Sequence, residues 1–445
     1  VESDQQIEML KSYGGKGGYV EVISSNDNYH PILTKTVAVY LRPLNHSEGY
    51  IIPINHDEGL NVDKNRIYDV LKSYTTLYTY DKKQLLYHFV LRDVIDISLL
   101  YSMTNYDRFD LPRINSTYNW FYNRLPDFKE VNALVPITKL YQKCEENFKA
   151  LECILQYAIP NGFDFYNKTA TTVFFYIEQS GLRVTYPEFI DLFKPNNPVF
   201  NIEDNITYTS YNLYNTTSRP TNAFNSVNFA AIPKAPEFRK AIIPQNDCFV
   251  EMDFDGYHLR LLCEQIGYEL TDESAHIQLA KLYFGKDEIG EDEYAKAKQI
   301  NFHAIYGKIP PEYAFLEVFD KIEKYIARLW KQFQEEGYVE DPISGKRFTS
   351  ELKDMHPQKL MNYTMQSLET SRNIIILKDL IMYLRDKKTR IALYTYDAIV
   401  FDFSKKEGRE VLEAIEKIMN QDGKYPIKFK YSNNLVFKNK IPIYR

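Results

Sequence analysis

Two short stretches each place a carboxylate in a setting suited to metal-dependent chemistry. Residues 249–254 alternate apolar and polar types as a strand does, and Asp253 lies near their end, just before a helix-like run. Residues 391–401 are rich in β-branched and aromatic types and carry one acidic residue, Asp397, at the middle. A carboxylate in such surroundings needs a neutralising partner. Two strand-borne carboxylates could hold a pair of divalent cations for phosphoryl transfer, although Asp253 alone also fits a helix N-cap.

A predicted helix carries a second set of residues suited to chemistry. Lys298, Phe302 and Tyr306 are spaced four apart in residues 292–307, so they lie on one face of a helix that ends at Gly307. A cation followed by two aromatic rings suits a ligand with phosphates at one end and a base and sugar at the other. Packing in the core is the alternative explanation for the two rings.

Asn362 and Gln366 share one face of another predicted helix, which runs from about residue 359 to residue 384. Amide side chains on a mostly apolar helix could reach the edges of bases or sugars. A polar face turned toward solvent explains the same pattern, so both interpretations stay open.

The composition is that of a globular chain with no sign of secretion. The 445 residues, 44% of them hydrophobic, are enough for two or three domains. The four cysteines show no C-x-x-C spacing, which indicates neither a zinc site nor a disulfide framework and favours a reducing, intracellular compartment. No apolar run reaches the roughly 18 residues of a membrane span, so we expect no membrane association.

The charge distribution limits how the chain can bind nucleic acid. The formal net charge of −6 argues against a protein that coats nucleic acid indiscriminately, but it is compatible with a polymerase or nuclease that has a local basic channel. Residues 423–445 contain several Lys and Arg and no Asp or Glu. This basic run fits a solvated surface or, beside a metal site, a strip that faces a phosphate backbone.

The order of the predicted elements indicates an α/β domain followed by more strands and helices. Strands are expected at residues 19–24, 36–41 and 50–54. Residues 1–18 contain a Gly-rich patch and are expected to form a flexible lead-in, whereas residues 64–157 show helical spacing. A helix is expected at 168–180. Residues 194–235, rich in Asn, Thr, Ser, Pro and Tyr, are predicted to join two domains.

Several motifs, in order, resemble those of family A DNA polymerases, the bacterial DNA polymerase I group. Residues 250–260 resemble motif A (D-Y-S-Q-I-E-L-R), residues 294–307 resemble motif B (R-x-x-x-K-x-x-x-F-G-x-x-Y-G), and residues 396–398 occupy the place of motif C (H-D-E). Smaller matches lie at residues 217–220, 238–244 and 337–347. The resemblance implies a polymerase palm with an antiparallel sheet and a set of helical fingers.

The resemblance also implies a role for each aligned residue. Asp253, Asp397 and the backbone carbonyl of Phe254 would bind two Mg²⁺ ions, and Lys298 would act with the two carboxylates in catalysis. The residues implied to bind the dNTP are His276, Lys298, Phe302, Tyr306 and His258, with His276 and Lys298 neutralising the triphosphate. The residues implied to bind primer-template DNA are Arg219, Arg260, Asn362 and Gln366.

The chain departs from the family pattern at four of these motif positions. His258 stands where the family has a Glu that excludes a ribose 2′-hydroxyl, and Tyr294 stands where motif B has an Arg. Ala398 replaces the acidic partner in motif C, and Asp255 is expected to supply some of the lost charge. The two implied metal ligands, Asp253 and Asp397, are retained.

The amino-terminal region resembles, more weakly, the family's 3′–5′ exonuclease, a ribonuclease H-like α/β fold. Asp81 matches the second acidic motif, but Val22 and Ser24 stand where the first strand needs a D-x-E pair. Asp81 and Asp96 alone cannot hold two metals, so the resemblance implies no proofreading. A register slip that brings Glu21 into the site is the alternative.

Only about twenty residues lie where the family places its long thumb helices, which implies a reduced thumb and low processivity without a partner. The expected domains are a lead-in (1–18), a degenerate exonuclease-like domain (19–160), a reduced thumb or linker (161–206), palm (207–265), fingers (266–336) and the rest of the palm (337–445).

We therefore expect a template-directed DNA polymerase that extends a primer with dNTPs in a nucleic-acid-associated, intracellular setting: bacterial or phage-infected cytoplasm, or an organelle. Its expected partners are primer-template DNA, dNTPs and a processivity or replisome protein. Two alternatives stay open. A primase or RNA polymerase on the same palm is favoured by the missing Glu at position 258. A non-catalytic replisome scaffold is favoured by the reduced thumb and weakened motifs.

Overall fold

A computed structural model of the chain describes residues 3–111, 116–194, 198–222, 227–421, 423–437 and 439–440. The chain divides into two compact units. The first consists of Val1–Gln179, Ile190–Asn215 and Asn222–Val227, and the second consists of Ser180–Phe189, Thr216–Thr221 and Asn228–Arg445. The chain thus passes between the units several times within the region of residues 179–228, which overlaps the predicted junction.

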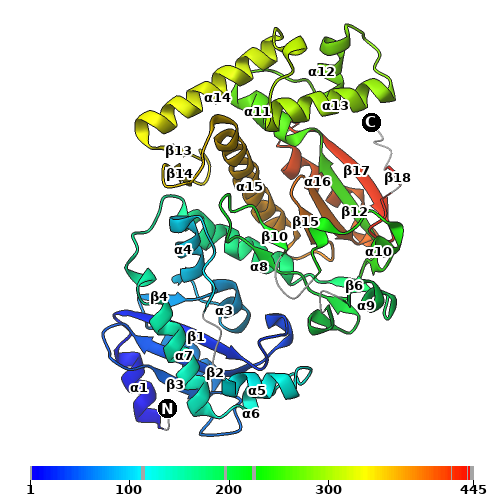
Figure 1. The fold of residues 1–445 in the computed structure, drawn as a ribbon. Helices are drawn as coiled ribbons and strands as arrows, with labels where there is room; N and C mark the ends of the chain where they lie inside the picture. Colours follow the sequence, from blue (N-terminus) through cyan, green and yellow to red (C-terminus); the bar gives the residue numbers. More distant parts are fainter. Residues whose placement is uncertain are drawn as a thin grey trace. The chain divides into compact units, whose positions relative to one another are not determined.

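The first unit is built on a mixed five-stranded sheet (Figure 1). Its strands are β1 (Gly17–Ser24), β2 (Thr36–Pro43), β3 (Tyr50–Pro53), β4 (Thr76–Thr79) and β5 (Val94–Asp96), in the order β3-β2-β1-β4-β5. β1, β2 and β3 pair antiparallel, whereas β4 pairs parallel with both β1 and β5. Parallel pairs need crossover connections, which α2 and α3 supply. The expected α/β class is confirmed for this unit.

Helices surround this sheet. They are α1 (Asp4–Ser12), α2 (Lys64–Lys72), α3 (Lys82–His88), α4 (Ile97–Asn105), α5 (Ser116–Arg124), α6 (Val131–Leu134), α7 (Ile137–Leu151) and α8 (Thr171–Glu178), the last of which continues a π-helical turn, Phe165–Ala170. A core of aliphatic side chains from α1, α2 and β1 to β4 holds the layers together. The helix predicted at 168–180 is therefore present, with its first part wound more loosely.

The prediction of a flexible lead-in over residues 1–18 was wrong. Helix α1 is capped by the Ser3 side chain, which accepts from Gln6 N, and it buries Ile7 and Leu10 in the core. The Gly-rich patch has a packing reason at Gly18, because a Cβ there would lie 2.8 Å from the Tyr74 ring. Close approach of a neighbouring ring, and not loop flexibility, explains this glycine.

The second unit is built on an antiparallel sheet. Its strands are β12 (Cys248–Phe254), β15 (Arg390–Thr395), β16 (Ala398–Phe403), β17 (Ile427–Ser432) and β18 (Asn439–Lys440), in the order β15-β16-β12-β17-β18. Every neighbouring pair in this order runs antiparallel (Figure 1). The expected antiparallel sheet is confirmed.

Residues 391–401 do not form the single strand that their composition predicted. They form a hairpin in which Thr395 pairs with Ala398, so Tyr396 and Asp397 make a two-residue turn. Tyr396 adopts a left-handed φ of +69°, a conformation that is uncommon for a bulky residue. Asp397 therefore lies at the tip of a hairpin and not in the middle of a strand.

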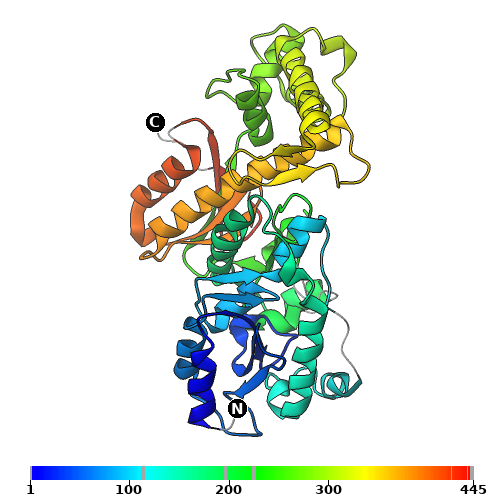
Figure 2. The same cartoon turned by 90° about the vertical axis from the view of Figure 1, so that its left-hand side faces the viewer.

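Helices of the second unit pack on the sheet and on one another (Figure 2). They are α10 (Pro236–Lys240), α11 (Tyr257–Gln265), α12 (Ala275–Phe284), α13 (Glu291–Tyr306), α14 (Glu317–Glu336), α15 (Pro357–Leu384) and α16 (Gly408–Asn420). The 28-residue α15 contacts α11, α13 and α14 on one side and α16 and β15 on the other. It therefore links the helical part of this unit to the sheet.

Short elements complete the described chain. They are α9 (Glu188–Phe193), β6 (Leu182–Val184), β7 (Ile202–Glu203), β8 (Ile206–Thr207), β9 (Tyr211–Asn212), β10 (Thr221–Asn222), β11 (Ile242–Ile243), β13 (Tyr338–Glu340) and β14 (Arg347–Thr349). Between β6 and β8, the residues that the structure describes form the six-residue helix α9 and a four-residue 3-10 helix, Pro198–Asn201, and no long helix. Within the described ranges, no helix is both long and apolar enough to span a bilayer.

Two buried histidines of the first unit predict acid sensitivity. Burial, together with the charge of Lys83, lowers the pKa of His30 to about 3. Burial, together with the charge of Lys64, lowers the pKa of His88 to about 4. An unfolded histidine titrates near pH 6.5, so between roughly pH 6.5 and the folded pKa the unfolded chain binds more protons. The stability from keeping these rings neutral is complete above pH 6.5 and is lost as the pH falls through that window.

We expect His30→Gln to reduce the pH dependence of stability. A protonation difference of one group changes the free energy of unfolding by about 1.4 kcal/mol per pH unit. Urea denaturation at pH 7.5, 6.5, 5.5 and 4.5 measures that free energy for the wild-type chain and the variant. The free energy of unfolding of the variant should fall less steeply with decreasing pH below 6.5, even if it is lower than that of the wild type at pH 7.5. Equal slopes for the two proteins would contradict the assignment.

Candidate functional site

The second unit contains a cavity of about 270 Å³ at the end of its sheet, and both candidate carboxylates, Asp253 and Asp397, line it. Asp253 is the penultimate residue of β12 and pairs with Ala398, the first residue of β16. Phe254 N donates to Asp397 O at 2.9 Å, so the hairpin tip is bonded directly to the end of β12. The two carboxylates are 144 positions apart in the sequence printed above, and both line this cavity, one from the end of β12 and one from the turn next to its neighbour β16.

The charge of Asp397 influences the protonation of Asp253. Burial raises the pKa of Asp253 to about 6, and the charge of Asp397 adds to the rise. Desolvation also raises the pKa of Asp397, and the charge of Glu369 adds to that rise. The Asp397 side chain is still accessible from the cavity. Lys430 opposes the rise at Asp253, with its Nζ 3.9 Å from Asp253 Oδ2. A pair of like charges at close range favours either shared protonation or a bound cation.

The face of α13 that carries Lys298, Phe302 and Tyr306 lines the same cavity. Lys298 Nζ lies 6.0 Å from the centroid of the Phe302 ring, and that ring stacks on Tyr306 with the centroids 5.7 Å apart. Phe302 is 46% exposed. Core packing, the alternative explanation for the two rings, therefore does not hold for Phe302.

His276 reaches the cavity from α12 with a defined donor direction. Tyr283 Oη donates to Asn301 Oδ1, and Asn301 Nδ2 donates to His276 Nδ1 at 2.8 Å. This order leaves the ring proton on Nε2. Burial lowers the pKa of His276 to about 4, with Lys298 adding to the effect and Asp255 opposing it. The contact of His276 with the triphosphate stays a prediction, and the lowered pKa favours a contact made through the Nε2–H donor.

His258, the residue in place of the family's Glu, also lines the cavity. Its Nδ1 bonds to the Tyr306 hydroxyl, and its Nε2 lies 3.0 Å from Glu369 Oε2. Glu369 is 1% exposed and also lies 3.0 Å from Arg219 Nη2. Arg219 itself lines the cavity, with its guanidinium carbon 3.9 Å from the centroid of the Tyr396 ring.

Gly256 makes the sharp turn between β12 and α11. Its φ of +56° is left-handed, and a Cβ would lie 3.0 Å from Ala275 Cβ. A residue with a side chain would be strained on both counts. The glycine therefore lets the strand end that carries Asp253 pass directly into the helix that carries His258.

Two residues expected at the site have internal roles. Arg260 is buried, and its guanidinium donates to the carbonyl oxygens of Asp255 at 2.9 Å, Thr271 at 2.9 Å and Glu273 at 2.6 Å. The prediction that Arg260 binds primer-template DNA does not fit this position, because its donors hold the α11–α12 connection together. Arg260 instead stabilises the fold of this unit.

Asp255 does not supply the charge missing at Ala398. Its carboxylate accepts from Ala275 N at 2.8 Å and pairs with Lys428. Burial would raise the pKa of Asp255, but the bonds from Lys428 and Ala275 keep it below its ordinary value. The charge is thus neutralised within the protein, and Asp255 does not line the cavity.

The basic run at the carboxyl end is also paired with acidic residues where it is described. Lys424 pairs with Glu264, Lys428 with Asp255, and Lys430 with Glu251, at 2.7 Å in the last case. Lys438, Lys440 and Arg445 lie outside the residues whose side chains are described. The described lysines of this run therefore neutralise acidic groups of the unit's own strands and helices.

Asn362 and Gln366 share a half-buried face of α15, as predicted, but neither lines the cavity. Asn362 Oδ1 is buried and has no hydrogen-bond partner within the protein. A buried amide oxygen without a partner is unusual and is a candidate contact for a bound molecule. The roles predicted for both amides, and for the cavity residues, remain predictions.

Comparisons with known proteins identify the fold. The solved structure of the POL domain of Pol1 from M. smegmatis, in complex with DNA primer-template and dNTP, matches with a TM-score of 0.67 and 13% identity, and the match covers 98% of this chain and 99% of that chain. This chain has the fold of a DNA polymerase I polymerase domain. No protein-family model matches it.

The sequence is similar to DNA polymerase I as well. The protein of that name from Aquifex aeolicus is 25% identical over 217 residues, which cover 41% of this chain and 37% of the relative. The one from Synechocystis sp. is 24% identical over 250 residues, which cover 44% of this chain and 25% of the relative. The chain thus spans well under half of each curated relative, and the predicted resemblance is confirmed.

Sequence reasoning missed Glu369, although a signal was present. Asn362, Gln366 and Glu369 follow the i, i+4, i+7 spacing of one helix face, and Asn373 extends it by one more turn. Asn373 Nδ2 donates to Tyr396 O at 2.8 Å, which shows that this polar stripe runs toward the hairpin turn. An acidic residue on the same helix face as the two amides was the clue.

The first unit has its own cavity, of about 230 Å³, where the exonuclease-like motif was expected. Asp81 lines it and caps α3 by accepting from Gln84 N at 3.1 Å. Asp96 caps α4, accepts from Leu99 N at 2.9 Å, and does not line the cavity. Glu21, the register-slip alternative, accepts from Asn147 Nδ2 at 2.8 Å and also does not line it. The carboxylates of Asp81, Asp96 and Glu21 therefore accept hydrogen bonds from groups of the first unit itself.

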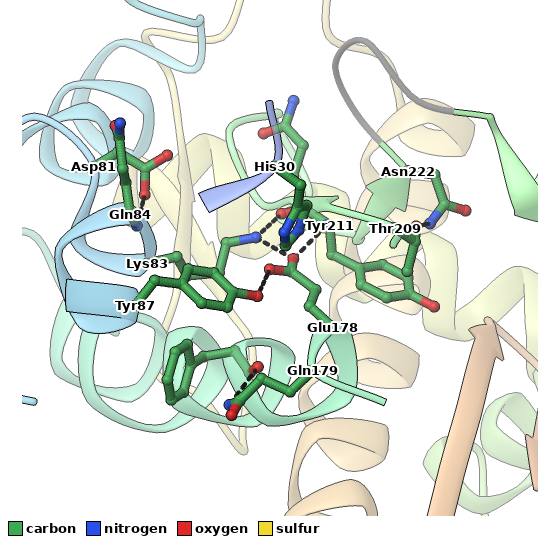
Figure 3. Close-up of polar contacts among 12 residues, drawn as sticks. His30, Asp81, Lys83, Gln84, Tyr87, Glu178, Gln179, Thr209, Tyr211 and Asn222 are labelled. Carbon is green, nitrogen blue, oxygen red and sulfur yellow. Dashed lines mark hydrogen bonds and ion pairs between the residues drawn. The ribbon is translucent and has the colours of Figure 1, made fainter. Parts of the chain in front are cut away.

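A buried ion pair occupies one wall of that cavity. Figure 3 shows the Glu178 carboxylate between the Lys83 ammonium and the Tyr87 hydroxyl, which donates at 3.0 Å. Tyr211 N also donates to Glu178, at 2.6 Å, and Lys83 donates to Tyr211 O. The pair therefore fixes the Tyr211 segment to α3 and α8. In the described part of the chain, no group of three or more His, Cys, Asp or Glu is placed to hold a metal ion.

We expect Lys83→Met to destabilise the protein strongly. It would leave Glu178 buried without a cation, and breaking such a pair lowers the free energy of unfolding by about 3–5 kcal/mol. Urea denaturation at pH 7.5 measures the loss. Lys129→Met is the matched control, since the Lys129–Glu203 pair is 43% and 47% exposed and should change stability by less than about 1 kcal/mol. Similar small losses for both variants would contradict the expectation.

Proposed function

We propose that this chain is a template-directed DNA polymerase that extends a primer with dNTPs. The observation that carries the proposal is the meeting of Asp253 and Asp397 in one cavity with the Lys298, Phe302 and Tyr306 face of α13. Paired carboxylates suit metal-assisted phosphoryl transfer, and the α13 face suits a nucleoside triphosphate. The similarity to DNA polymerase I, and to a structure that contains DNA primer-template and dNTP, supports the same conclusion.

The carboxylates fit Mg²⁺, which we propose as the cofactor in the form of two ions. Oxygen ligands are those that Mg²⁺ prefers, and two adjacent carboxylates with raised pKa values gain from a cation between them. Asp253, Asp397 and the Phe254 carbonyl would hold the ions together with oxygens of the substrates. When bound, Mg²⁺ lowers the pKa of the primer 3′-hydroxyl and stabilises the departing pyrophosphate.

The other cavity residues would orient the incoming nucleotide. Lys298 supplies a flexible positive charge for the triphosphate, and His276 supplies an Nε2–H donor whose direction Asn301 fixes. Phe302 and Tyr306 present stacked rings that a base pair and sugar can pack against. Together these groups act by positioning.

We propose that Arg219, Asn362 and Gln366 contact the primer-template DNA. Arg219 lies in the cavity beside the hairpin that carries Asp397, a suitable position for the primer terminus. The unpartnered Asn362 Oδ1 could accept a hydrogen bond from a base edge, since the guanine amino group is a minor-groove donor. Gln366 lies one helical turn further along the same face.

We further propose low processivity and no proofreading. The short α9 stands where the family's long thumb helices are expected, so grip on duplex DNA would depend on a processivity or replisome protein. Asp81 and Asp96 are helix caps, and no third carboxylate joins them in a metal-binding group within the described ranges. A nuclease that uses two metals needs more ligands than these.

One observation favours a second candidate, an RNA polymerase or primase on the same fold. His258 stands where the family has the Glu that excludes the ribose 2′-hydroxyl. A hydroxyl carries no net charge, so exclusion by the imidazole would come from its bulk and position. Comparing extension by dNTPs and by rNTPs separates the two candidates. The scaffold alternative is disfavoured because both carboxylates are retained in one cavity.

We expect Asp397→Asn to reduce primer extension by more than about a thousandfold while DNA binding stays nearly intact. The amide keeps the shape but cannot provide the anionic ligand. Single-nucleotide extension with Mg²⁺ and fluorescence anisotropy of labelled primer-template measure the two properties. Asp386→Asn is the matched control, because Asp386 is exposed and does not line the cavity. Extension by the Asp397 variant at the wild-type rate would refute the proposal.

We expect no 3′–5′ shortening of single-stranded or mismatched DNA. A 5′-labelled oligonucleotide incubated with the chain and Mg²⁺, without dNTPs, should keep its length while the same preparation extends a matched primer when dNTPs are added. The extension reaction shows that the protein is active. Shortening that Asp81→Ala removes would show that the first unit is a working nuclease.

A further inference from the structure

Glu369 is a buried carboxylate that faces the nucleotide cavity from α15. It is 1% exposed, and its Oε2 lies 3.0 Å from both Arg219 Nη2 and His258 Nε2. An ionised carboxylate is costly to bury unless charged or donor groups surround it. Arg219 and His258 therefore surround this carboxylate, which has no role in the reaction proposed above.

His258 is held from both sides of its ring. Nε2 faces the Glu369 carboxylate, and Nδ1 bonds to the Tyr306 hydroxyl. The three residues come from different helices, α11, α13 and α15. His258 Nε2 and Glu369 Oε2 lie 3.0 Å apart without forming a hydrogen bond in this state, so Glu369 restrains the ring through close contact and charge, while the Tyr306 hydroxyl bonds to Nδ1.

The same carboxylate is linked to the hairpin that carries Asp397. Arg219, its second partner, stacks on the ring of Tyr396 with 3.9 Å between the guanidinium carbon and the ring centroid. Tyr396 has a left-handed backbone, and its carbonyl accepts from Asn373 Nδ2 at 2.8 Å. Glu369 thus connects the helix that carries His258 to the strand turn beside the two carboxylates.

We propose that Glu369 is a positioning residue for selection of the nucleotide sugar. It holds the His258 imidazole rigidly against Tyr306, so that the ring cannot turn away from a ribose 2′-hydroxyl. The inference rests on the proposed function and deepens it, because it explains how an imidazole at position 258 can exclude a ribose 2′-hydroxyl where the family uses a carboxylate. A free imidazole would rotate about its side-chain bonds and admit the larger sugar.

Steady-state incorporation of one dNTP and of the matching rNTP, with Mg²⁺ and a defined primer-template, tests the proposal on the full chain. We expect Glu369→Gln and Glu369→Ala to lower the ratio of the two kcat/KM values by about tenfold or more. The change should come mainly from a gain with the rNTP, while kcat with the dNTP changes by less than about threefold. Glu369→Gln keeps the side-chain volume and carries the test if Glu369→Ala does not fold.

Two further variants separate positioning from general damage. His258→Ala should lower the ratio by itself, and adding Glu369→Ala to it should change the ratio no further, since the carboxylate acts through the imidazole. Asp341→Asn is the matched control. Asp341 is a buried carboxylate that accepts from Ser367 and Ser371 of the same helix, α15, but does not line the cavity. It should leave the ratio unchanged.

Three outcomes overturn the inference. One is an unchanged ratio in both Glu369 variants, with thermal unfolding showing that they are folded. Another is an equal loss of activity with dNTP and rNTP together with a higher Mg²⁺ requirement, which would make Glu369 a metal ligand. A wild-type chain that extends no primer at all overturns the proposed function, and this inference with it. Extension by the wild type with an unaltered ratio in the variants overturns this inference alone.

Discussion

The antiparallel pairing of β12 with β16 is the constraint on which the candidate site depends. This register sets Asp253 opposite Ala398 and bonds Phe254 N to Asp397 O at 2.9 Å. Successive side chains on a strand point to opposite faces, so a slip of one residue would turn Asp253 away and expose Met252, which is fully buried. Apolar burial on the other face of β12 therefore fixes the position of the carboxylate.

Helices bring most of the remaining groups to this strand end, and two of the buried carboxylates nearby lie beside cations. Asp255 is neutralised by Lys428, and Glu369 by Arg219 with His258 beside it. The first unit follows the same rule, with Glu178 paired to Lys83. Burial of a charge is tolerated only with such partners, and each pair in turn limits how its elements can move relative to each other.

The elements and faces that depend on local pattern could be predicted from the sequence. The alternation in β12 and the four-residue spacing of Lys298, Phe302 and Tyr306 were sufficient, since each is set by the geometry of one strand or one helix. The resemblance placed Arg219, His258 and His276 at the cavity, and the fold comparison agrees with the expected fold class.

What could not be predicted depends on contacts between distant segments. The turn at Tyr396 contains no glycine that would predict a left-handed backbone. Asn373 and Arg219, from other segments, stabilise this conformation instead. The neutral state of His276 depends on burial and on Asn301, and the internal role of Arg260 depends on carbonyls of the following loop. The glycines before β1 suggested flexibility because nothing in the local sequence reveals that Tyr74 packs against Gly18.

Gly256 has a consequence for how such a chain can diverge. The turn at Gly256 places the carboxylate of Asp253 on a sheet and the cavity-lining His258 on a helix, only two residues beyond the turn. Replacements on the helix can therefore alter which nucleotide is accepted while the sheet keeps its register. Under the proposed function, the residue at position 258 and the carboxylate at position 253 could therefore change independently of each other.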